Sequence, residues 1–412
     1  MIAYERTTLA NGLTVAVNRD RASKLAAVNI LYKVGARNEN PARTGFAHLF
    51  EHLMFRGTRE VPNFDLPVQM ASGDNNAFTN NDYTDFYITL PKDNLETALW
   101  LESDRMEGLE ITPEKLAAEK KVVIEEFRQR YLNQPYGDQT MLLRALAYKV
   151  HPYRWAAIGL TTEHIASASP DDVGEFYRTQ YHPSNAILSI SADMEEERML
   201  ELAEKWFGGL PDTPRPAAPI PQEPPQEAPR REEVERDVPA TTVTVAYRMG
   251  TRTSPDFYTA DLVSDLLSGG DSGRLYRHLV KERRLLSSVN AYVTGDLDPG
   301  LFVFTGQLLP GVAPEAAEAA FREEIEALRT APISQYETEK VKNKFEANTL
   351  FGELNVMNKA MNLGFYEMLG DLPLINGEVA RYRAVSDEDI RAFCRSTLRP
   401  ENASTLIYKA RK

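Results

Sequence analysis

The stretch His48-Leu49-Phe50-Glu51-His52 is the most informative part of this 412-residue sequence. Two histidines four positions apart on a helix project from the same face, because about one helical turn separates them. Neutral imidazoles are good zinc ligands, and two of them leave room for a third protein ligand and a water molecule. The glutamate between them is placed to take a proton from that water. The spacing H-x-x-E-H therefore predicts a catalytic zinc site.

The residues around the motif predict the helix that carries it. Apolar side chains recur there at helical spacing: Phe46, Leu49, Phe50, Leu53 and Met54. Such a helix can bury one side and leave His48, Glu51 and His52 on another. Gly57 is typical of the residue that ends a helix. A helix whose histidines only cap or pack is the alternative that this stretch leaves open.

The segment 114–130 offers a third ligand. Apolar residues give it one hydrophobic face and predict a long helix: Leu116, Val122, Val123, Ile124 and Phe127. Glu119 and Glu126 are seven positions apart, so they share nearly the same face, whereas Glu125 points about 100° away. One of the pair can complete the metal site while the other supports a ligand from behind. Ordinary solvated glutamates on an acidic helix are the alternative.

The motif, followed 74 positions after His52 by Glu126, resembles the pitrilysin, insulinase and mitochondrial processing peptidase family. In that family two histidines and a distant glutamate bind zinc (Zn²⁺), the glutamate of the motif is the general base, and another glutamate assists. The resemblance implies that His48, His52 and Glu126 are zinc ligands. It also implies that Glu51 is the catalytic base and Glu119 the assisting catalytic residue.

The resemblance extends over most of the chain, through residues 9–15, 35–39, 76–79, 82–87 and 181–185. The family lays its peptide substrate along a strand that corresponds to the third of these segments. The resemblance therefore implies that Asn76, Ala77 and Phe78 bind substrate. Asn76 is equally well explained as a turn-forming asparagine, because it follows Gly73, Asp74 and Asn75.

The second half of the sequence repeats the first. Residues 28–37 align without gaps to residues 243–252, an offset of 215. The same offset places Val263, Leu266 and Leu267 where the motif has His48, Glu51 and His52. The sequence therefore predicts a tandem duplication whose second copy has lost the metal site.

A proline-rich segment separates the two copies. Residues 211–239 hold 9 of the 25 prolines, among many charged residues, and such a segment cannot pack a core. We expect a metal-binding domain at 1–210, a linker at 211–239 and a homologous domain at 240–412. A recognition segment for a proline-binding partner is the alternative for the linker.

Alternating and helical patterns predict an α+β fold. We expect two tandem domains, each a largely antiparallel sheet with helices packed on one face. The expected strands are 13–17, 26–32, 86–90, 186–191, 241–248, 287–294 and 300–308. The expected helices are 96–107, 114–130, 139–147, 194–207, 314–329, 334–366 and 387–395.

Composition narrows the class of protein. A chain of 412 residues exceeds the size of a single hydrophobic core, and no apolar run is long enough for a membrane span. The one cysteine, Cys394, excludes an intramolecular disulfide and is expected to be a buried packing residue. The net charge of −13 argues against nucleic acid and anionic membranes as partners. The first residues do not resemble a secretory signal, so we expect a cytoplasmic protein, or a periplasmic one if a signal peptide has been removed.

One departure from the family pattern concerns the partner. Active members carry an arginine and a tyrosine, seven residues apart, that clamp the substrate and stabilise the oxyanion. The corresponding positions here are Val280 and Ser287, and neither side chain can replace its counterpart. Arg277 or Arg284 would have to act from one helical turn away. We therefore predict one half of a heterodimeric zinc metalloendopeptidase, whose homologous partner supplies the arginine and the tyrosine.

Two other functions remain open at this stage. One is a self-sufficient homodimeric processing peptidase, and the other is a non-catalytic scaffold like the core subunits of the respiratory cytochrome bc complex. The family encloses its substrates in a chamber, so the resemblance favours short or unfolded peptides.

Overall fold

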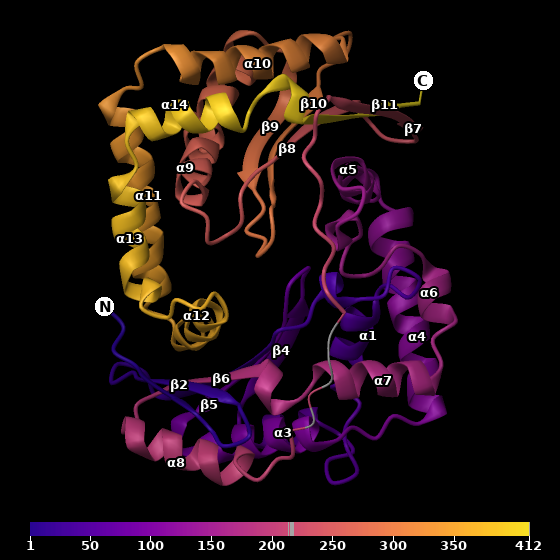
Figure 1. Ribbon diagram of the computed structural model, residues 1–412, viewed down its shortest axis with the longest axis vertical. Helices are drawn as coiled ribbons and strands as arrows, with labels where there is room; N and C mark the ends of the chain where they lie inside the picture. The colour runs from indigo at the N-terminus through magenta and orange to yellow at the C-terminus, as the bar shows by residue number, and fades with distance from the viewer. Residues whose placement is uncertain (213, 215–217, 412) are drawn as a thin grey trace. The chain divides into compact units, whose positions relative to one another are not determined.

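The chain forms two compact units (Figure 1). The computed structural model describes residues 1–212, 214 and 218–411. Unit 1 consists of Met1–Arg128, Trp155–Pro221 and Leu350–Gly377, and unit 2 of Gln129–Arg154, Gln222–Thr349 and Glu378–Lys412. Compared with the domains expected at 1–210 and 240–412, each unit thus contains a segment from the other half of the sequence.

Unit 1 is built on a six-stranded sheet in the order β1-β2-β6-β3-β5-β4. The pair β2/β6 is parallel and the other neighbouring pairs are antiparallel. Its strands are β1 (Glu5–Thr8), β2 (Thr14–Arg19), β3 (Leu25–Tyr32), β4 (Asp74–Thr79), β5 (Thr84–Pro91) and β6 (Ala186–Ala192). Because successive side chains of β3 point to opposite faces, its burial from Ala26 to Tyr32 means that both faces of the sheet are covered.

Seven α-helices in the described first half of the sequence belong to unit 1. They are α1 (Phe46–Leu53), α2 (Asp65–Met70), α3 (Leu95–Glu107), α4 (Pro113–Phe127), α6 (Thr162–Ala166), α7 (Pro170–Gln180) and α8 (Glu196–Phe207). Of these, α1, α2, α3 and α8 contact this sheet. α3 packs against β3 and β5, and α8 against β2. α1 contacts β4 and β5 and also α4 and α7, which brings the predicted metal helix next to the edge strand.

A helix from the second half of the sequence covers the opposite face. α12 (Val356–Met368) packs against β2, β3 and β6, and Figure 1 shows it across the sheet from α3 and α8. Its Val356 and Ala360 cluster with Ala27. Gly364 lies so close to the sheet that an added Cβ would be 2.8 Å from the Asn29 Oδ1.

Unit 2 repeats this arrangement. Its five-stranded sheet has the order β7-β11-β8-β10-β9, which matches β2-β6-β3-β5-β4, and again only the first of these pairs, β7/β11, is parallel. The strands are β7 (Arg230–Arg236), β8 (Thr242–Arg248), β9 (Leu286–Val293), β10 (Leu301–Leu308) and β11 (Ala403–Ala410). The remaining helices are α5 (Gln139–Ala147), α9 (Phe257–Ser268), α10 (Pro314–Thr330), α11 (Gln335–Gly352), α13 (Leu374–Ala384) and α14 (Asp387–Ser396).

The second sheet also receives one helix from the other half of the sequence. Val243, Val245 and Tyr247 of β8 face a core that includes residues of α9, α10 and α14. The opposite face meets α5, whose Gln139 hydrogen-bonds to Thr244 over 2.7 Å. The two repeats therefore exchange α5 and α12. The α+β fold with two similar, largely antiparallel sheets is confirmed, but the helices are not confined to one face of each sheet, because both faces need cover.

Two predicted segments differ in the structure. The helix expected over 334–366 is two helices, because Asn355 begins α12 by accepting hydrogen bonds from the N–H groups of Met357 and Asn358. The linker expected at 211–239 includes strand β7, whose side chains alternate between half-buried and exposed as it pairs with β11. Residues 213 and 215–217 of that linker lie outside the described residues.

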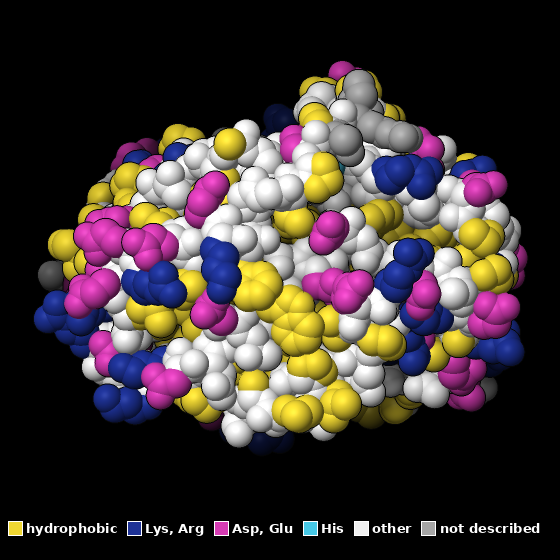
Figure 2. Space-filling view, turned by 90° about the horizontal axis from the view of Figure 1, so that it is seen from below, with side chains coloured by type: hydrophobic (Ala, Val, Ile, Leu, Met, Phe, Trp, Pro, Cys, Tyr) yellow, Lys and Arg dark blue, Asp and Glu magenta, His cyan; other side chains and the backbone are white. Residues whose placement is uncertain are grey.

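The surface shown in Figure 2 mixes acidic, basic and hydrophobic side chains and gathers no continuous basic stripe among the side chains described on this face. Cys394 is buried, as predicted. Within the described part of the chain, no helix combines the length and the apolar character that crossing a membrane requires.

Candidate metal centre

The helix that carries the motif is anchored at its first turn. Gly45 adopts φ +88, and an added Cβ would lie 2.6 Å from the Ile158 carbonyl oxygen. The Glu39 carboxylate accepts hydrogen bonds of 2.9 Å from the N–H groups of Gly45 and Ala47, and one of 3.1 Å from the Trp155 indole. Burial raises the pKa of Glu39 to about 8, although these donors oppose the shift. The close contact of Gly45 with Ile158 and the hydrogen bonds to Glu39 together hold the start of α1 in place.

The apolar side of α1 packs in the core of unit 1, and the motif lies on another side of the helix. Phe50 stacks on Tyr177 and Tyr181, and the neighbouring apolar residues of the helix are also buried. Glu51 and His52 are half-buried, and His48 is 9% exposed. The predicted helix thus separates its packing residues from its polar motif, as the spacing suggested.

The structure brings His48, His52 and Glu126 together. One candidate ligand atom from each lies within 4.8 Å of the others. The Nε2 atoms of His48 and His52 lie 3.8 Å and 3.4 Å from the two carboxylate oxygens of Glu126. One other group of this kind occurs among the described residues, Glu195–Glu197, and it consists of acidic side chains at the start of α8.

Glu119 lies behind His52 rather than among the candidate ligands. Its Oε2 is 3.3 Å from the His52 Nδ1, and its Oε1 pairs with Arg56. Burial lowers the pKa of His52, but hydrogen bonds to Glu119 and Glu126 outweigh burial and raise it to about 9. The sequence did not predict this contact of Arg56 with Glu119. The position of Arg56, four residues after His52, was the available signal.

Glu125 lies away from the group. Its side chain is 53% exposed and is 3.7 Å from Arg128 on the same helix. The difference between Glu125 and Glu126 follows from their angular separation on α4.

Glu51 lies near β5, the strand that pairs with the expected substrate strand. Its negative charge contributes to the raised pKa of Tyr87, for which burial is the first cause. Tyr87 is the partner of Asn76 in the register of β5 and β4. β4 ends the sheet and pairs only with β5, so its other edge carries no strand among the described residues.

The three residues expected to bind substrate lie along β4. Asn76 is exposed, and its side-chain oxygen accepts a hydrogen bond of 2.9 Å from the Ala77 N–H. Phe78 is half-buried, with its ring 5.6 Å from that of Tyr83. Asn76 therefore belongs to a strand rather than to a turn.

In the second repeat, apolar residues occupy the three positions that correspond to the motif. Val263, Leu266 and Leu267 of α9 are buried in the core of unit 2. Val280 packs partly buried against the same core, and the Ser287 hydroxyl donates to the Gln307 side chain over 3.0 Å. Neither Val280 nor Ser287 offers the cationic or phenolic group expected at its position.

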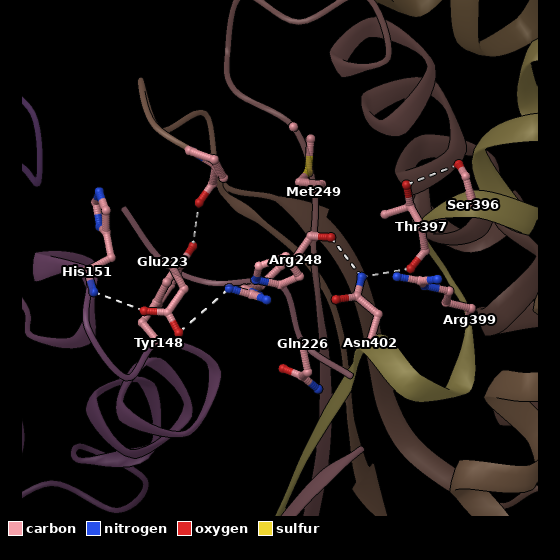
Figure 3. Close-up of a pocket in the computed structure, with 13 residues that line it drawn as sticks. Tyr148, His151, Glu223, Gln226, Arg248, Met249, Ser396, Thr397, Arg399 and Asn402 are labelled. Carbon is pink, nitrogen blue, oxygen red and sulfur yellow. Dashed lines mark hydrogen bonds and ion pairs between the residues drawn. The ribbon is translucent and has the colours of Figure 1, made fainter. Parts of the chain in front are cut away.

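Unit 2 contains a separate pocket of about 280 Å³ (Figure 3). At its wall, Glu223 accepts hydrogen bonds from the backbone N–H groups of Lys149, Val150 and His151, and lies 3.6 Å from Arg248. None of the residues predicted to act in catalysis or metal binding lines this pocket. These contacts attach the proline-rich segment at Glu223 to the residues that directly follow α5.

Comparisons with known proteins show which family the chain resembles. The family model of insulinase, peptidase family M16, matches residues 14–155, and the model of the peptidase M16 inactive domain matches residues 167–345. The zinc protease PqqE of Helicobacter pylori is 32% identical over 345 residues, which cover 82% of this chain and 78% of that protein. A crystal structure of a protease from Helicobacter pylori matches with a TM-score of 0.94 at 28% identity, covering 99% of this chain and 100% of that chain.

A more distant likeness concerns the fold alone. The periplasmic protease PqqL from Escherichia coli matches with a TM-score of 0.80 at 16% identity, over 99% of this chain and 48% of that chain. The family resemblance predicted from the motif is confirmed by the family models and by PqqE. The chain belongs to the insulinase family of zinc peptidases, peptidase family M16.

Proposed function

We propose that this chain is the zinc-holding subunit of a metalloendopeptidase that cleaves short or unfolded peptides. A homologous partner chain completes the active site. The observation that carries the proposal is the group of His48, His52 and Glu126, held by α1 and α4 next to the edge strand β4. The similarity to a zinc protease supports the same chemistry.

The donor set fits a catalytic zinc ion. Two imidazole nitrogens and one carboxylate oxygen are a usual set of three protein ligands for catalytic zinc, with a fourth position for water or substrate. When bound there, zinc would supply Lewis-acid polarisation of a peptide carbonyl and would lower the pKa of a water molecule.

The protein's own residues would bind the peptide and move the proton. Glu51 would accept a proton from the attacking water and return it to the leaving amine. The unpaired edge of β4 would hold the peptide as an added strand, through main-chain hydrogen bonds along Asn76, Ala77 and Phe78. Main-chain hydrogen bonds depend little on the side chains of the bound peptide, so this mode of binding suits peptides of varied sequence.

The need for a partner rests on Val280 and Ser287. Each oxyanion donor is worth roughly two to three powers of ten in rate, so a chain without these donors would be a slow enzyme by itself. The chain spans 48% of PqqL, whose fold thus continues in a chain of about twice this length. For a protein of about half that length, a second homologous chain would take the place of the remaining half.

The test combines zinc content with peptide hydrolysis by the purified chain. We expect a single zinc ion per chain in the wild type and in Glu51→Gln, and its loss in His48→Ala. A quenched fluorescent peptide mixture should be hydrolysed by the wild type only slowly, with Glu51→Gln as the blank. Absence of zinc would contradict the metal site and favour a scaffold. Rapid hydrolysis that depends on Glu51 would establish the peptidase but contradict the need for a partner.

Restoring the missing pair separates a half-enzyme from a scaffold. The double variant Val280→Arg with Ser287→Tyr should gain Glu51-dependent hydrolysis, by about two powers of ten or more. The matched control is Val280→Arg with Ser288→Tyr, because Ser288 is the next residue of β9 and is also exposed. Equal activity of both double variants would show that the gain does not come from the restored pair.

A further inference from the structure

The Glu119 carboxylate lies between the candidate metal ligand His52 and the arginine Arg56, which is not itself a candidate ligand. Arg56 donates to the Glu119 Oε1 through both Nε and Nη2, while the Oε2 of the same carboxylate lies 3.3 Å from the His52 Nδ1. The Glu119 side chain is 2% exposed and that of Arg56 is 49% exposed. One buried carboxylate thus links a surface arginine to a candidate zinc ligand.

The chain after α1 fixes the position of Arg56. Arg56 is four residues beyond His52, and its backbone N–H donates to the Leu53 carbonyl over 2.9 Å, so the helical turn continues to this residue. Gly57 then adopts φ +79, where an added Cβ would collide with the carbonyl oxygens of Val61 and Pro62. This turn ends the helical path directly after Arg56.

The contact at Nδ1 matters because an imidazole has two different nitrogens. Of the two neutral forms of an imidazole, a carboxylate at Nδ1 favours the one that carries its hydrogen on Nδ1, and this form has its lone pair on Nε2. The His52 Nε2 is the nitrogen that faces Glu126, at 3.4 Å. Glu119 therefore selects the form of His52 that can bind a metal ion at the side of Glu126.

Glu119 itself needs a counter-charge. It is buried close to a second carboxylate, Glu126, since both contact the ring of His52. A buried carboxylate in such surroundings is costly unless a cation pairs with it. Arg56 is the cation paired with Glu119, and its two donors to one oxygen leave the other oxygen directed at His52.

We propose that Arg56 is a positioning residue for the metal site: it holds the Glu119 carboxylate against the His52 Nδ1, and so fixes the ring that presents Nε2 to zinc. The proposal rests on the zinc site proposed above. It gives Arg56 no contact with the substrate and assigns its effect to ligand orientation.

The sign of the effect on zinc affinity separates orientation from simple electrostatics. Removing a positive charge near a divalent cation should tighten binding if only the net charge matters. Removing a residue that orients a ligand should weaken binding, by about 10- to 100-fold for this type of supporting contact. The two explanations predict opposite changes.

The experiment measures zinc affinity by competition with a chromogenic chelator. We expect Arg56→Met to weaken zinc binding by about 10- to 100-fold, and Arg56→Lys to retain part of the affinity. The matched control is Arg59→Met, which removes an exposed cation three residues further along. It should bind zinc like the wild type. The visible absorption of the Co²⁺-loaded protein, which reports ligand geometry, should change in Arg56→Met and not in the control.

A second pair of variants tests whether Arg56 acts through Glu119. In a Glu119→Gln background, Arg56→Met should cause no further loss of zinc affinity. Unchanged or tighter zinc binding in Arg56→Met would overturn the proposal, and so would additive losses in the double variant. A decrease in the unfolding free energy of the metal-free protein with unchanged zinc affinity would assign Arg56 a purely structural role. Failure of the wild type to bind zinc would count against the proposed function instead.

Discussion

Asp85 is a single buried carboxyl whose ionisation should affect stability. It lies on β5, is 2% exposed, and accepts a hydrogen bond from the Asn29 side chain. Burial raises the pKa of Asp85 from 3.8 to about 8, and the nearby negative charge of Glu102 adds to the shift. The hydrogen bond from Asn29 opposes the shift without cancelling it.

The direction of the pH effect follows from this raised pKa. Between about pH 4 and pH 8 the folded state keeps a proton that the unfolded chain has released. The contribution of Asp85 to the free energy of unfolding therefore falls as the pH rises through this range. Asp85→Asn should remove up to about 1.4 kcal/mol of that dependence per pH unit.

Urea unfolding at pH 6 and pH 9 measures this effect. We expect the wild type to lose more stability than Asp85→Asn between the two pH values. Equal losses in both proteins would mean that Asp85 is ionised throughout. The comparison between the two proteins is needed because Glu39, whose pKa is also about 8, contributes to both.

At the scale of elements, the contact of α12 with the first sheet depends on a residue without a side chain. An added Cβ on Gly364 would lie 2.8 Å from the Asn29 Oδ1 and 3.3 Å from the Ser189 Oγ. Both neighbours belong to the sheet and are completely buried, so they have little room to move. Gly364 therefore sets the distance between α12 and the sheet.

Gly364→Ala should destabilise the protein by roughly 1–3 kcal/mol, because the methyl group overpacks this contact. Alanine in place of glycine normally stabilises a helix by about 1 kcal/mol, so the expected sign is opposite to helix propensity. Gly174→Ala is the matched control, since the Cβ there would meet only the flexible Arg178 side chain. Denaturant unfolding should show a loss for the first variant and no loss for the second.

Elements with a local pattern were predictable from the sequence. The helix predicted at 387–395 corresponds to α14, where Ser386 and Asp389 form a capping box. The strands predicted at 26–32 and 86–90 correspond to β3 and β5, whose buried apolar residues are continuous or alternate. The secondary structure of residues with these patterns is determined largely by their immediate neighbours in the sequence.

Elements fixed by distant partners were not predictable in this way. β7 consists mainly of charged residues and forms a strand because β11, about 170 residues further along, pairs with it. The placement of α12 on the first sheet has no local signal either, because periodicity identifies an apolar face without identifying what covers it.

The candidate site shows the same division. His48, Glu51 and His52 are defined by a spacing within one helix, and the seven-residue interval between Glu119 and Glu126 by a second helix. Both signals are local, but the spacing of Glu119 and Glu126 is also typical of solvated glutamates, and the family resemblance was needed to assign them to the site. The proposed role of Arg56 depends on how α1 and α4 pack together, and an arginine near a helix end is too common to stand out.

At the scale of the whole molecule, the exchange of α5 and α12 should make the two halves of the chain depend on each other. A fragment of residues 1–221 contains every strand of the first sheet but lacks α12. The sheet face with Ala16, Ala27 and Leu31 would then be open to water. Exposing this area should cost several kcal/mol at roughly 25 cal/mol per Å² of apolar surface.

We expect this fragment to bind a hydrophobic dye and to unfold without a cooperative transition. Joining Leu350–Gly377 to it through a flexible linker should restore cooperative unfolding, because this segment supplies α12. Joining Pro314–Thr330 instead provides the control, since α10 is amphipathic but belongs to the second sheet. Cooperative unfolding of the isolated fragment would contradict the expected dependence.

The exchanged helix also sets the order in which the protein can be completed during synthesis. The last strand of the first sheet ends at Ala192, but α12 ends at Met368. A nascent chain emerging from the ribosome therefore contains all six strands of the first sheet, but not the helix that covers one apolar face, while the whole second sheet, apart from β11, is being translated. During that interval the uncovered face is a target for chaperones, and a slower ribosome would prolong its exposure.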